Sequence, residues 1–171
     1  MTDSPILATF PQEGHDHGRC VDDALAAAEL RCTRDAASLT KLRRRVLELV
    51  WQSHGPVRAY DLLDRLRAER RSAAPPTVYR ALDFLLAHGL IHRIESLNAY
   101  VGCSDPDRKH GGQFLICRSC GTVAELDDDG VARAVAERAR ALGFEVERQT
   151  IEVMGLCPGC AAGAAADVSA T

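Results

Sequence analysis

The spacing of apolar residues divides the chain into a helical first half and a mixed second half. Apolar side chains at intervals of three and four predict four helices, over residues 20–30, 39–54, 59–70 and from Thr77 to Gly89. Thr77 follows a proline pair and suits the N-cap or first turn, and Gly89 suits the C-terminal cap. Two strand-like runs follow, at residues 90–94 and 99–101. Helices followed by a hairpin predict a winged helix-turn-helix, with the last helix in the major groove and the hairpin as the wing.

After residue 112 strands alternate with one helix. Residues 114–116, 122–126 and 145–154 are typical of strands, and residues 131–142 form an amphipathic helical pattern that Gly143 ends. About fifty residues bury too little core to be stable alone. We therefore expect this second α+β domain to need a stabilising cross-link, such as a bound metal, or a partner chain.

Charge is distributed unevenly along the chain. Residues 41–95 hold eleven basic and six acidic side chains, although the whole chain has a net charge of −3. The basic excess includes Arg43-Arg44-Arg45 and Arg70-Arg71, and it suits a nucleic-acid surface on the first domain. A solvated, charged helix face fits the same pattern equally well.

The expected compartment decides how the seven cysteines are interpreted. The chain has no apolar run of about 18 residues, so no membrane span is predicted. Residues 1–11 lack the basic start and apolar stretch of a secretory signal. We therefore expect a cytoplasmic protein, in which thiols stay reduced and metal binding is favoured over disulfides.

Two Cys-x-x-Cys pairs, Cys117–Cys120 and Cys157–Cys160, are separated by 36 residues. Each pair can place two thiolates on one side of a tight turn, supported by Gly121 or Gly159, and the two pairs can complete a tetrahedral four-sulfur zinc site. Thioredoxin-like redox chemistry would need one pair ahead of a helix in a βαβ unit, whereas both pairs follow predicted strands. Four protein ligands leave no open position, so the predicted site is structural.

Four further candidate ligands surround the expected hinge: His92, Cys103, His110 and Glu125. Each alone also fits an ordinary role, as a strand residue, a small buried residue or a surface charge. Together, imidazole, thiolate and carboxylate can make a closed tetrahedral zinc site. The soft thiolate favours zinc over iron(II), manganese or magnesium and does not exclude cobalt or nickel.

Several stretches resemble the ferric uptake regulator family. Residues 76–85 are similar to the recognition helix of that family, and residues 59–64 are similar to the helix before it. Residues 90–103 resemble the wing and hinge of the zinc uptake regulators, the zinc-sensing branch of the family. The resemblance runs from about Leu39 to Cys160 without a large gap.

The resemblance implies an α+β fold, with an N-terminal winged helix-turn-helix followed by a small α/β dimerisation domain. The implied organisation is a flexible tail (1–15), a DNA-binding domain (16–102), a hinge (103–112), a dimerisation domain with the four-cysteine zinc site (113–160) and a second tail (161–171). The protein would be a zinc-dependent homodimeric repressor of zinc-uptake genes, with two zinc ions per subunit. Its partner would be double-stranded promoter DNA, and neither a membrane, nor a small-molecule substrate, nor an enzymatic activity is implied.

Carried over position by position, the resemblance assigns three sets of residues. The structural zinc ligands would be Cys117, Cys120, Cys157 and Cys160. The regulatory zinc ligands would be His92, Cys103, His110 and Glu125. The DNA contacts would be Thr77, Tyr79 and Arg80.

The chain departs from the family pattern before the first cysteine pair. Iron-sensing members carry a histidine-rich run there, whereas this chain has only His110, which argues against a further metal site. Residues 33–38 also differ from the usual spacing. In the N-terminal region His15, His17 and Cys20 could chelate metal, and Cys32 is typical of a small helix-end residue.

Three other functions compete with that of a zinc-dependent repressor. An iron, manganese or peroxide sensor of the same family is the nearest, and Cys103 argues against it. A zinc-binding protein without a DNA function would need no recognition helix. A zinc hydrolase would need an open ligand position, which a four-ligand set does not leave.

Overall fold

The computed structural model of the 171-residue chain describes residues 6–8, 17–53, 55–107, 112–126 and 128–168. The chain forms two compact units. The helical unit comprises Pro11–Lys109, and the sheet unit comprises Met1–Phe10 with His110–Thr171. Within the described ranges no helix combines the length and apolarity needed to cross a bilayer.

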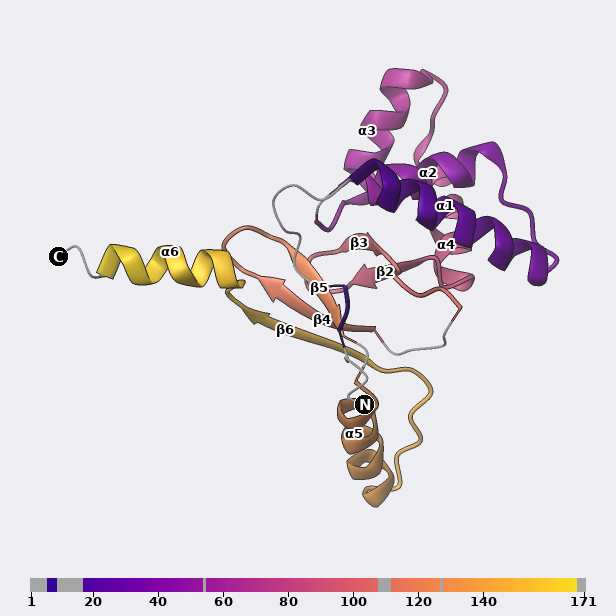
Figure 1. Ribbon diagram of the computed structural model, residues 1–171. Coiled ribbons are helices and arrows are strands. Elements are labelled where there is room, and N and C mark those ends of the chain that lie inside the picture. The colour runs from indigo at the N-terminus through magenta and orange to yellow at the C-terminus, as the bar shows by residue number, and fades with distance from the viewer. Residues whose placement is uncertain (1–5, 9–16, 54, 108–111, 127, 169–171) are drawn as a thin grey trace. The chain divides into compact units, whose positions relative to one another are not determined.

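Four helices build the helical unit (Figure 1): α1 (His17–Arg34), α2 (Lys41–Trp51), α3 (Ala59–Glu69) and α4 (Pro75–Ala87). Their apolar stripes meet in one core, in which Val46, Leu62 and Leu82 are fully buried. Burying each such side chain contributes about 1.5–3 kcal/mol. Helix α4 begins two residues before the predicted Thr77 because proline suits the first positions of a helix. Gly89, with φ +66°, follows the helix at its C-terminal end.

A two-stranded wing follows α4. Strands β2 (Ile91–Ile94) and β3 (Ala99–Gly102) pair antiparallel, with Ile91 opposite Gly102 and Ile94 opposite Ala99. The backbones of Val57 and Tyr100 exchange two hydrogen bonds, of 2.9 and 2.8 Å. This bridge fastens the segment before α3 to the wing, and no local sequence pattern predicted it.

Gly102, the last residue of β3, lies against the indole ring of Trp51 at the end of α2. A Cβ atom at this position would lie 2.7 Å from Cζ2 of Trp51, and closer still to two other atoms of the ring. Glycine is therefore required for the wing to approach α2 this closely. The next residue along the chain is Cys103.

The sheet unit holds four strands in the order β1 (Ile6–Ala8), β5 (Val123–Leu126), β4 (Gly112–Cys117) and β6 (Thr150–Gly155). Strands β4 and β5 form an antiparallel hairpin, whereas β4 and β6 are parallel and are joined by a crossover that contains α5 (Asp129–Ala141). The two parallel strands end side by side, with Cys117 opposite Gly155. This pairing brings distant parts of the sequence to one edge of the sheet.

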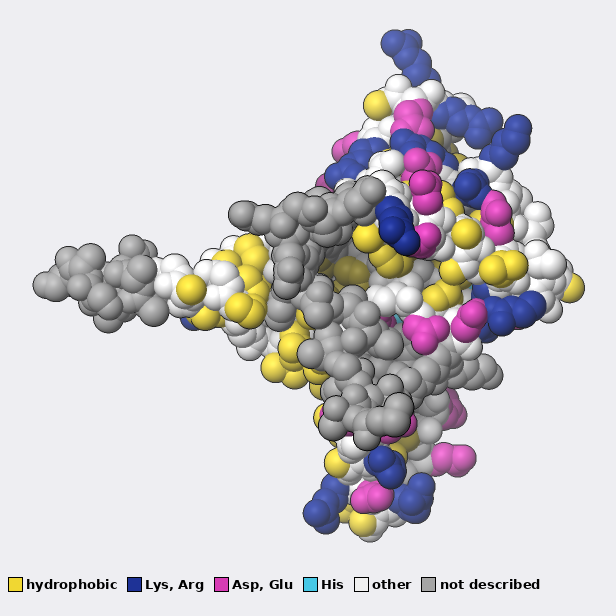
Figure 2. All heavy atoms as spheres, viewed as in Figure 1, with side chains coloured by type: hydrophobic (Ala, Val, Ile, Leu, Met, Phe, Trp, Pro, Cys, Tyr) yellow, Lys and Arg dark blue, Asp and Glu magenta, His cyan; other side chains and the backbone are white. Residues whose placement is uncertain are grey.

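The sheet unit buries little of its apolar surface. Phe114, Ile116 and Ala124 are buried, but no residue of α5 is. The large apolar residues left exposed in this unit are Val131, Val135, Leu142, Phe144, Val153, Met154 and Leu156. Hydrophobic side chains are visible on the surface around β6 in Figure 2. The single chain thus leaves apolar side chains uncovered on α5, on β6 and on the segments that follow them.

Both chain ends depart from the sequence prediction. Ile6–Ala8, expected in a flexible tail, forms strand β1 beside β5, a long-range pairing with no local signal. Residues 161–168, expected as a tail, belong to helix α6 (Pro158–Val168), because alanine is the best helix former. The predicted strand over residues 145–154 is shorter at its start, since β6 begins at Thr150.

Candidate metal centres and nucleic-acid interface

The four cysteines of the two Cys-x-x-Cys pairs meet at one end of the sheet unit. Cys117 ends β4, and Cys120 lies in the turn after it. Cys157 lies between β6 and α6, and Cys160 lies in the first turn of α6. The parallel pairing of β4 with β6 is what joins the two Cys-x-x-Cys segments. All four cysteines are free, and their sulfur atoms lie within 4.8 Å of one another.

The geometry of this cluster fits a tetrahedral metal ion. A Zn–S bond of about 2.3 Å places the sulfurs of a regular tetrahedron about 3.8 Å apart. The Sγ atoms of Cys120 and Cys157 are 3.7 Å apart, far beyond the roughly 2.05 Å of a disulfide. The donor set, four cysteine sulfurs, is one that zinc prefers for structural sites.

Backbone N–H groups point at two of the sulfurs. The N–H of Cys157 donates to Sγ of Cys117 at 3.3 Å, and the N–H of Cys160 donates to Sγ of Cys157 at 3.5 Å. Gly121 adopts φ +76° and donates its N–H to the carbonyl of Cys117 at 2.9 Å, which closes the first turn. These donors stabilise negative charge on sulfur, and the start of α6 adds the positive end of a helix dipole.

The pKa values of these thiols are shifted in different directions. Backbone hydrogen bonds, first from Cys120 and then from Cys157, lower the pKa of Cys117 to about 6. A hydrogen bond with Thr122 lowers the pKa of Cys120. Ser119 lowers the pKa of Cys160, but the neighbouring sulfurs outweigh it and raise that pKa to about 12. Four thiolates therefore need a cation among them, and metal binding would release protons.

Two of the predicted regulatory ligands lie together on the wing. The N–H of Cys103 donates to the carbonyl of Leu90 at 3.1 Å, and His92 is two residues further along β2. Because side chains alternate along strands, His92 and Cys103 occupy one face of the hairpin. Their ligand atoms lie within 4.8 Å of each other, with Cys103 buried and His92 half-buried.

The other two predicted ligands belong to the sheet unit. Glu125 lies on β5 between β1 and β4, opposite Phe114, and is only 4% exposed. A buried carboxylate is costly unless it is paired or coordinated, which makes this position unusual for glutamate. His110 lies outside the described residues.

Helix α4 presents a polar outer face. Thr77, Tyr79, Arg80 and Asp83 are exposed, whereas Val78 and Leu82 between them are buried in the core. Tyr79 is 41% exposed despite its aromatic ring. The side chains predicted to contact DNA are therefore accessible on the face of α4 that points away from the core.

The first basic run is largely neutralised within the helical unit. Arg44 pairs with Glu29, and Arg45 pairs with both Glu48 and Glu69. Arg43 lies over the ring of Phe84, 3.6 Å from its centroid. The sequence analysis included these three arginines in the basic excess that suits a nucleic-acid surface or a solvated helix face, and in the structure each contacts a partner within the helical unit.

A second set of basic residues lies on α3, on the loop after it and on α4. Arg65 and Arg67 of α3, Arg70 and Arg71 of the loop after it, and Arg80 of α4 are all exposed. Figure 2 shows Lys and Arg side chains gathered in the part of the helical unit that carries α3. No ion pair of Arg70, Arg71 or Arg80 is found within the described part of the chain. Arg70 and Arg71, in the loop that leads into α4, and Arg80 on α4 itself therefore offer positive charge near the exposed residues of this helix.

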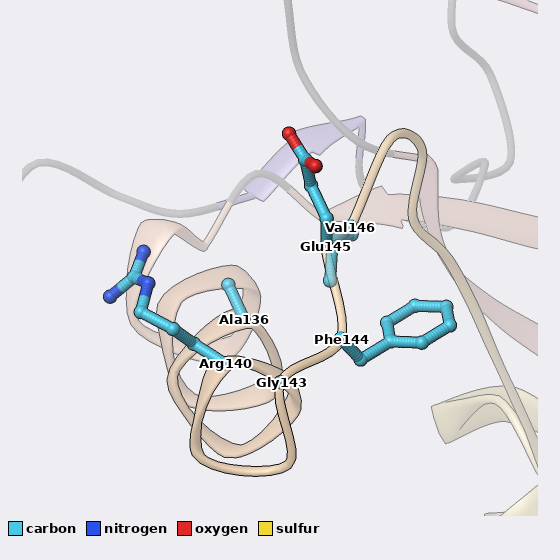
Figure 3. Close-up of a pocket in the computed structure, with 6 residues that line it drawn as sticks. All are labelled: Ala136, Arg140, Gly143, Phe144, Glu145 and Val146. Carbon is cyan, nitrogen blue, oxygen red and sulfur yellow. The ribbon is translucent and has the colours of Figure 1, made fainter.

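The end of α5 borders a shallow hollow of about 430 Å³ (Figure 3). Ala136 and Arg140 line it from the helix, and Phe144, Glu145 and Val146 line it from the segment that follows. Phe144 is 66% exposed, and its ring points away from α5. The hollow extends the surface of α5 that a partner chain could cover.

The remaining candidate ligands do not form a cluster within the described residues. His17 begins α1, Cys20 is half-buried in the same helix, and His15 lies outside the described part of the chain. Cys32 is buried near the end of α1, where burial, followed by the charge of Asp35, raises the pKa of its thiol. The interpretation of Cys32 as a small packed residue agrees with this position.

Comparison with known proteins gives consistent matches. A sequence profile described as the Ferric uptake regulator family matches residues 35–154. The zinc uptake regulation protein of Escherichia coli strain K12 is 43% identical over 139 residues, which are 81% of each protein. A solved structure of a zinc uptake regulator complexed with zinc and DNA is similar with a TM-score of 0.81 at 42% identity, covering 85% of this chain and 97% of the other. The crystal structure of holo XcZur is similar with a TM-score of 0.77 at 46% identity, covering 82% and 99%.

Proposed function

Because this chain belongs to the ferric uptake regulator family, we propose that it is a zinc-dependent homodimeric repressor that binds promoter DNA in the cytoplasm and controls zinc-uptake genes. The observation that carries this proposal is the pair formed by His92 and the buried Cys103 on the wing of a winged helix. An imidazole and a thiol side by side suit zinc, and the wing is part of a DNA-binding fold.

We propose two zinc ions per subunit with separate tasks. The structural ion is held by four cysteines, Cys117, Cys120, Cys157 and Cys160. It stabilises the sheet unit, whose own apolar core is small. His92, Cys103, His110 and Glu125 hold the regulatory ion. Bound zinc supplies a divalent charge that gathers these ligands and stabilises Cys103 as a thiolate.

The regulatory ligands come from both units, since Glu125 lies on β5 and His92 lies on β2. When all four ligands are engaged, the helical unit loses freedom relative to the sheet unit. A state bound more tightly by the metal gains population in proportion to that difference in affinity. In a two-fold dimer the two α4 helices would then match half-sites about 34–36 Å apart, or a multiple of that spacing.

The dimer is supported by the uncovered apolar side chains of the sheet unit. Val135 of α5 and Val153 and Met154 of β6 are about half exposed, in a unit with little core of its own. A second copy of the chain would remove such side chains from water.

DNA binding is supported by the outer face of α4 and the arginines beside it. Arg80 can read a guanine edge by two hydrogen bonds, Tyr79 and Thr77 can donate to phosphates, and Arg70 and Arg71 add positive charge. Because phosphate contacts release counterions, affinity should fall steeply with salt.

The decisive experiment measures DNA binding by the purified chain in buffered zinc, iron(II) and manganese. The probe is a duplex selected from random sequence by the zinc-loaded protein. We expect zinc to tighten binding, whereas iron(II) and manganese leave it nearly unchanged. Equal responses to iron(II) or manganese would instead identify a sensor of another metal.

Cys103→Ser tests the division between the two metal sites, because a hydroxyl is a poor zinc ligand. This variant should remain dimeric, keep one zinc per subunit and lose zinc-induced DNA binding. Cys20→Ser, which changes a half-buried thiol in α1, is the matched control and should behave like the wild type. Normal zinc-induced binding by Cys103→Ser would contradict the regulatory assignment, and loss of the dimer would show that the sites are divided wrongly.

A further inference from the structure

A row of polar contacts connects the segment after the wing to the end of α4 by way of α1. Arg31 of α1 donates from Nη1 to the carbonyl of Pro106 at 2.6 Å and from Nε to Oδ2 of Asp35 at 3.0 Å. The same carboxylate oxygen lies 2.9 Å from Nδ1 of His88. His88 is the C-cap residue of α4.

A second contact holds the same segment. Arg34, one helical turn after Arg31, pairs with the carboxylate of Asp107. Residues 106 and 107 therefore lie against α1, although the sequence analysis placed them in a hinge. Pro106 lies three residues after Cys103, one of the proposed regulatory ligands. A displacement of Cys103 on metal binding would therefore act on Pro106 and Asp107 through a short length of chain.

The other end of the row is built into the last turn of α4. The backbone N–H of His88 donates to the carbonyl of Phe84 at 3.1 Å, and the two rings lie 4.3 Å apart. Phe84 is in turn covered by the guanidinium of Arg43. A shift of Asp35 would therefore be transmitted to the helix that presents Tyr79 and Arg80.

The contacts are better shielded than an ordinary surface pair. The side chains of Arg31, Asp35 and His88 are 20%, 32% and 21% exposed. The Arg19–Asp23 pair on the same helix is 80% and 76% exposed. Shielding from water strengthens charge-assisted hydrogen bonds, whereas exposed pairs contribute little.

The turn that presents Asp35 is held in an uncommon conformation. Ala36, the next residue, has φ +50°, a region that alanine seldom occupies. The N–H of Ala37 donates to the carbonyl of Cys32 at 2.8 Å and helps to hold the turn. Such conformations persist where the surroundings fix them, which keeps Asp35 between its two partners.

We propose that Arg31, Asp35 and His88 are positioning residues that transmit occupancy of the regulatory site from the Cys103–Asp107 segment to α4. This inference rests on the proposed zinc-dependent DNA binding and names residues that act in it without touching metal or DNA. Arg31 lies in α1 and precedes residue 35, where the match to the family profile begins.

The test uses the full-length protein and the selected duplex described above. DNA affinity is measured at saturating zinc and with the regulatory site emptied by a buffered chelator, and the ratio is the zinc-induced gain. Arg31→Ala and Asp35→Asn should each reduce this gain by roughly twofold to thirtyfold while DNA affinity without regulatory zinc changes little. The double variant should lose no more than the larger single loss, because both changes interrupt one row of contacts.

Controls separate this role from simple destabilisation. Arg19→Ala removes an exposed pair from the same helix and should keep the wild-type gain. Arg31→Lys keeps the charge and the fold but cannot bridge Pro106 and Asp35 with a planar fork, so it should lose part of the gain with a normal melting temperature. A wild-type gain in Arg31→Ala and Asp35→Asn, or equal losses of affinity with and without zinc, would overturn the proposal. If the wild-type protein shows no zinc-induced gain, it is the proposed function that fails.

Discussion

Replacing Gly102 with alanine tests how tightly the wing must approach α2. The new Cβ would overlap the indole ring of Trp51, which is too large to move aside without disturbing α2. Overpacking of this kind costs about 1–3 kcal/mol. For a unit of roughly 100 residues, each kcal/mol lowers the melting temperature by about 4–8 °C, so the expected fall is about 4–24 °C.

The assay is calorimetric melting of the helical unit within the full-length protein, together with a zinc titration of the regulatory site. Because Cys103 follows Gly102 directly, a displaced strand should weaken zinc binding as well as stability. Trp51→Phe in the same protein removes part of the ring, and it should recover much of what Gly102→Ala loses. Gly155→Ala, where a Cβ meets nothing within 4 Å, is the matched control.

Two results would refute this reasoning. A Gly102→Ala protein that melts like the wild type would mean that the ring moves aside at no cost. A loss that Trp51→Phe does not reduce would mean that contact with the ring is not its cause, since residues in contact should show non-additive effects.

Three further outcomes are expected. Cys117→Ser should lose the structural zinc, whose binding contributes roughly 10–16 kcal/mol in small metal domains, and with it the dimer, as checked by metal content and size-exclusion chromatography. Arg80→Ala should weaken binding to the selected duplex by about 1–3 kcal/mol if Arg80 reads a guanine, as measured by fluorescence anisotropy at fixed salt. Hydrogen bonds from His88 and then Arg31 lower the pKa of Asp35. Its stabilising effect is therefore present above the unfolded pKa and lost as the pH falls through the folded pKa, so melting temperatures measured from pH 7 to 3 should decline less for Asp35→Asn.

The helical unit was predictable because its information is local. Periodic apolar residues such as Leu82 and Leu85 marked α4, and both are buried as the stripe requires. The Val57–Tyr100 bridge and the contact of Gly102 with Trp51 join residues 43 and 51 positions apart, and no local pattern encodes such pairs.

The charge prediction located a basic region of the sequence, but it did not identify which arginines are available to bind DNA. Composition counted Arg44 and Arg45 with the nucleic-acid face, whereas the fold supplies both with carboxylates from other helices. Whether an arginine is available depends on tertiary neighbours, and these are invisible in a count of charges. The cysteine spacing was more informative, because a four-sulfur site restricts the fold as well as the chemistry.

The second Cys-x-x-Cys pair lies far along the chain, so the structural zinc centre can form only late in synthesis. Every residue of the helical unit has been synthesised once Lys109 is added, whereas the zinc centre also needs Cys157 and Cys160. At about 5–20 residues per second, the second pair follows Cys120 by roughly 2–8 seconds. During that interval the nascent chain contains every residue of the winged helix but only the first of the two cysteine pairs of the structural site. A chain cut short in this stretch would keep the DNA-reading helix but lack the structural zinc centre.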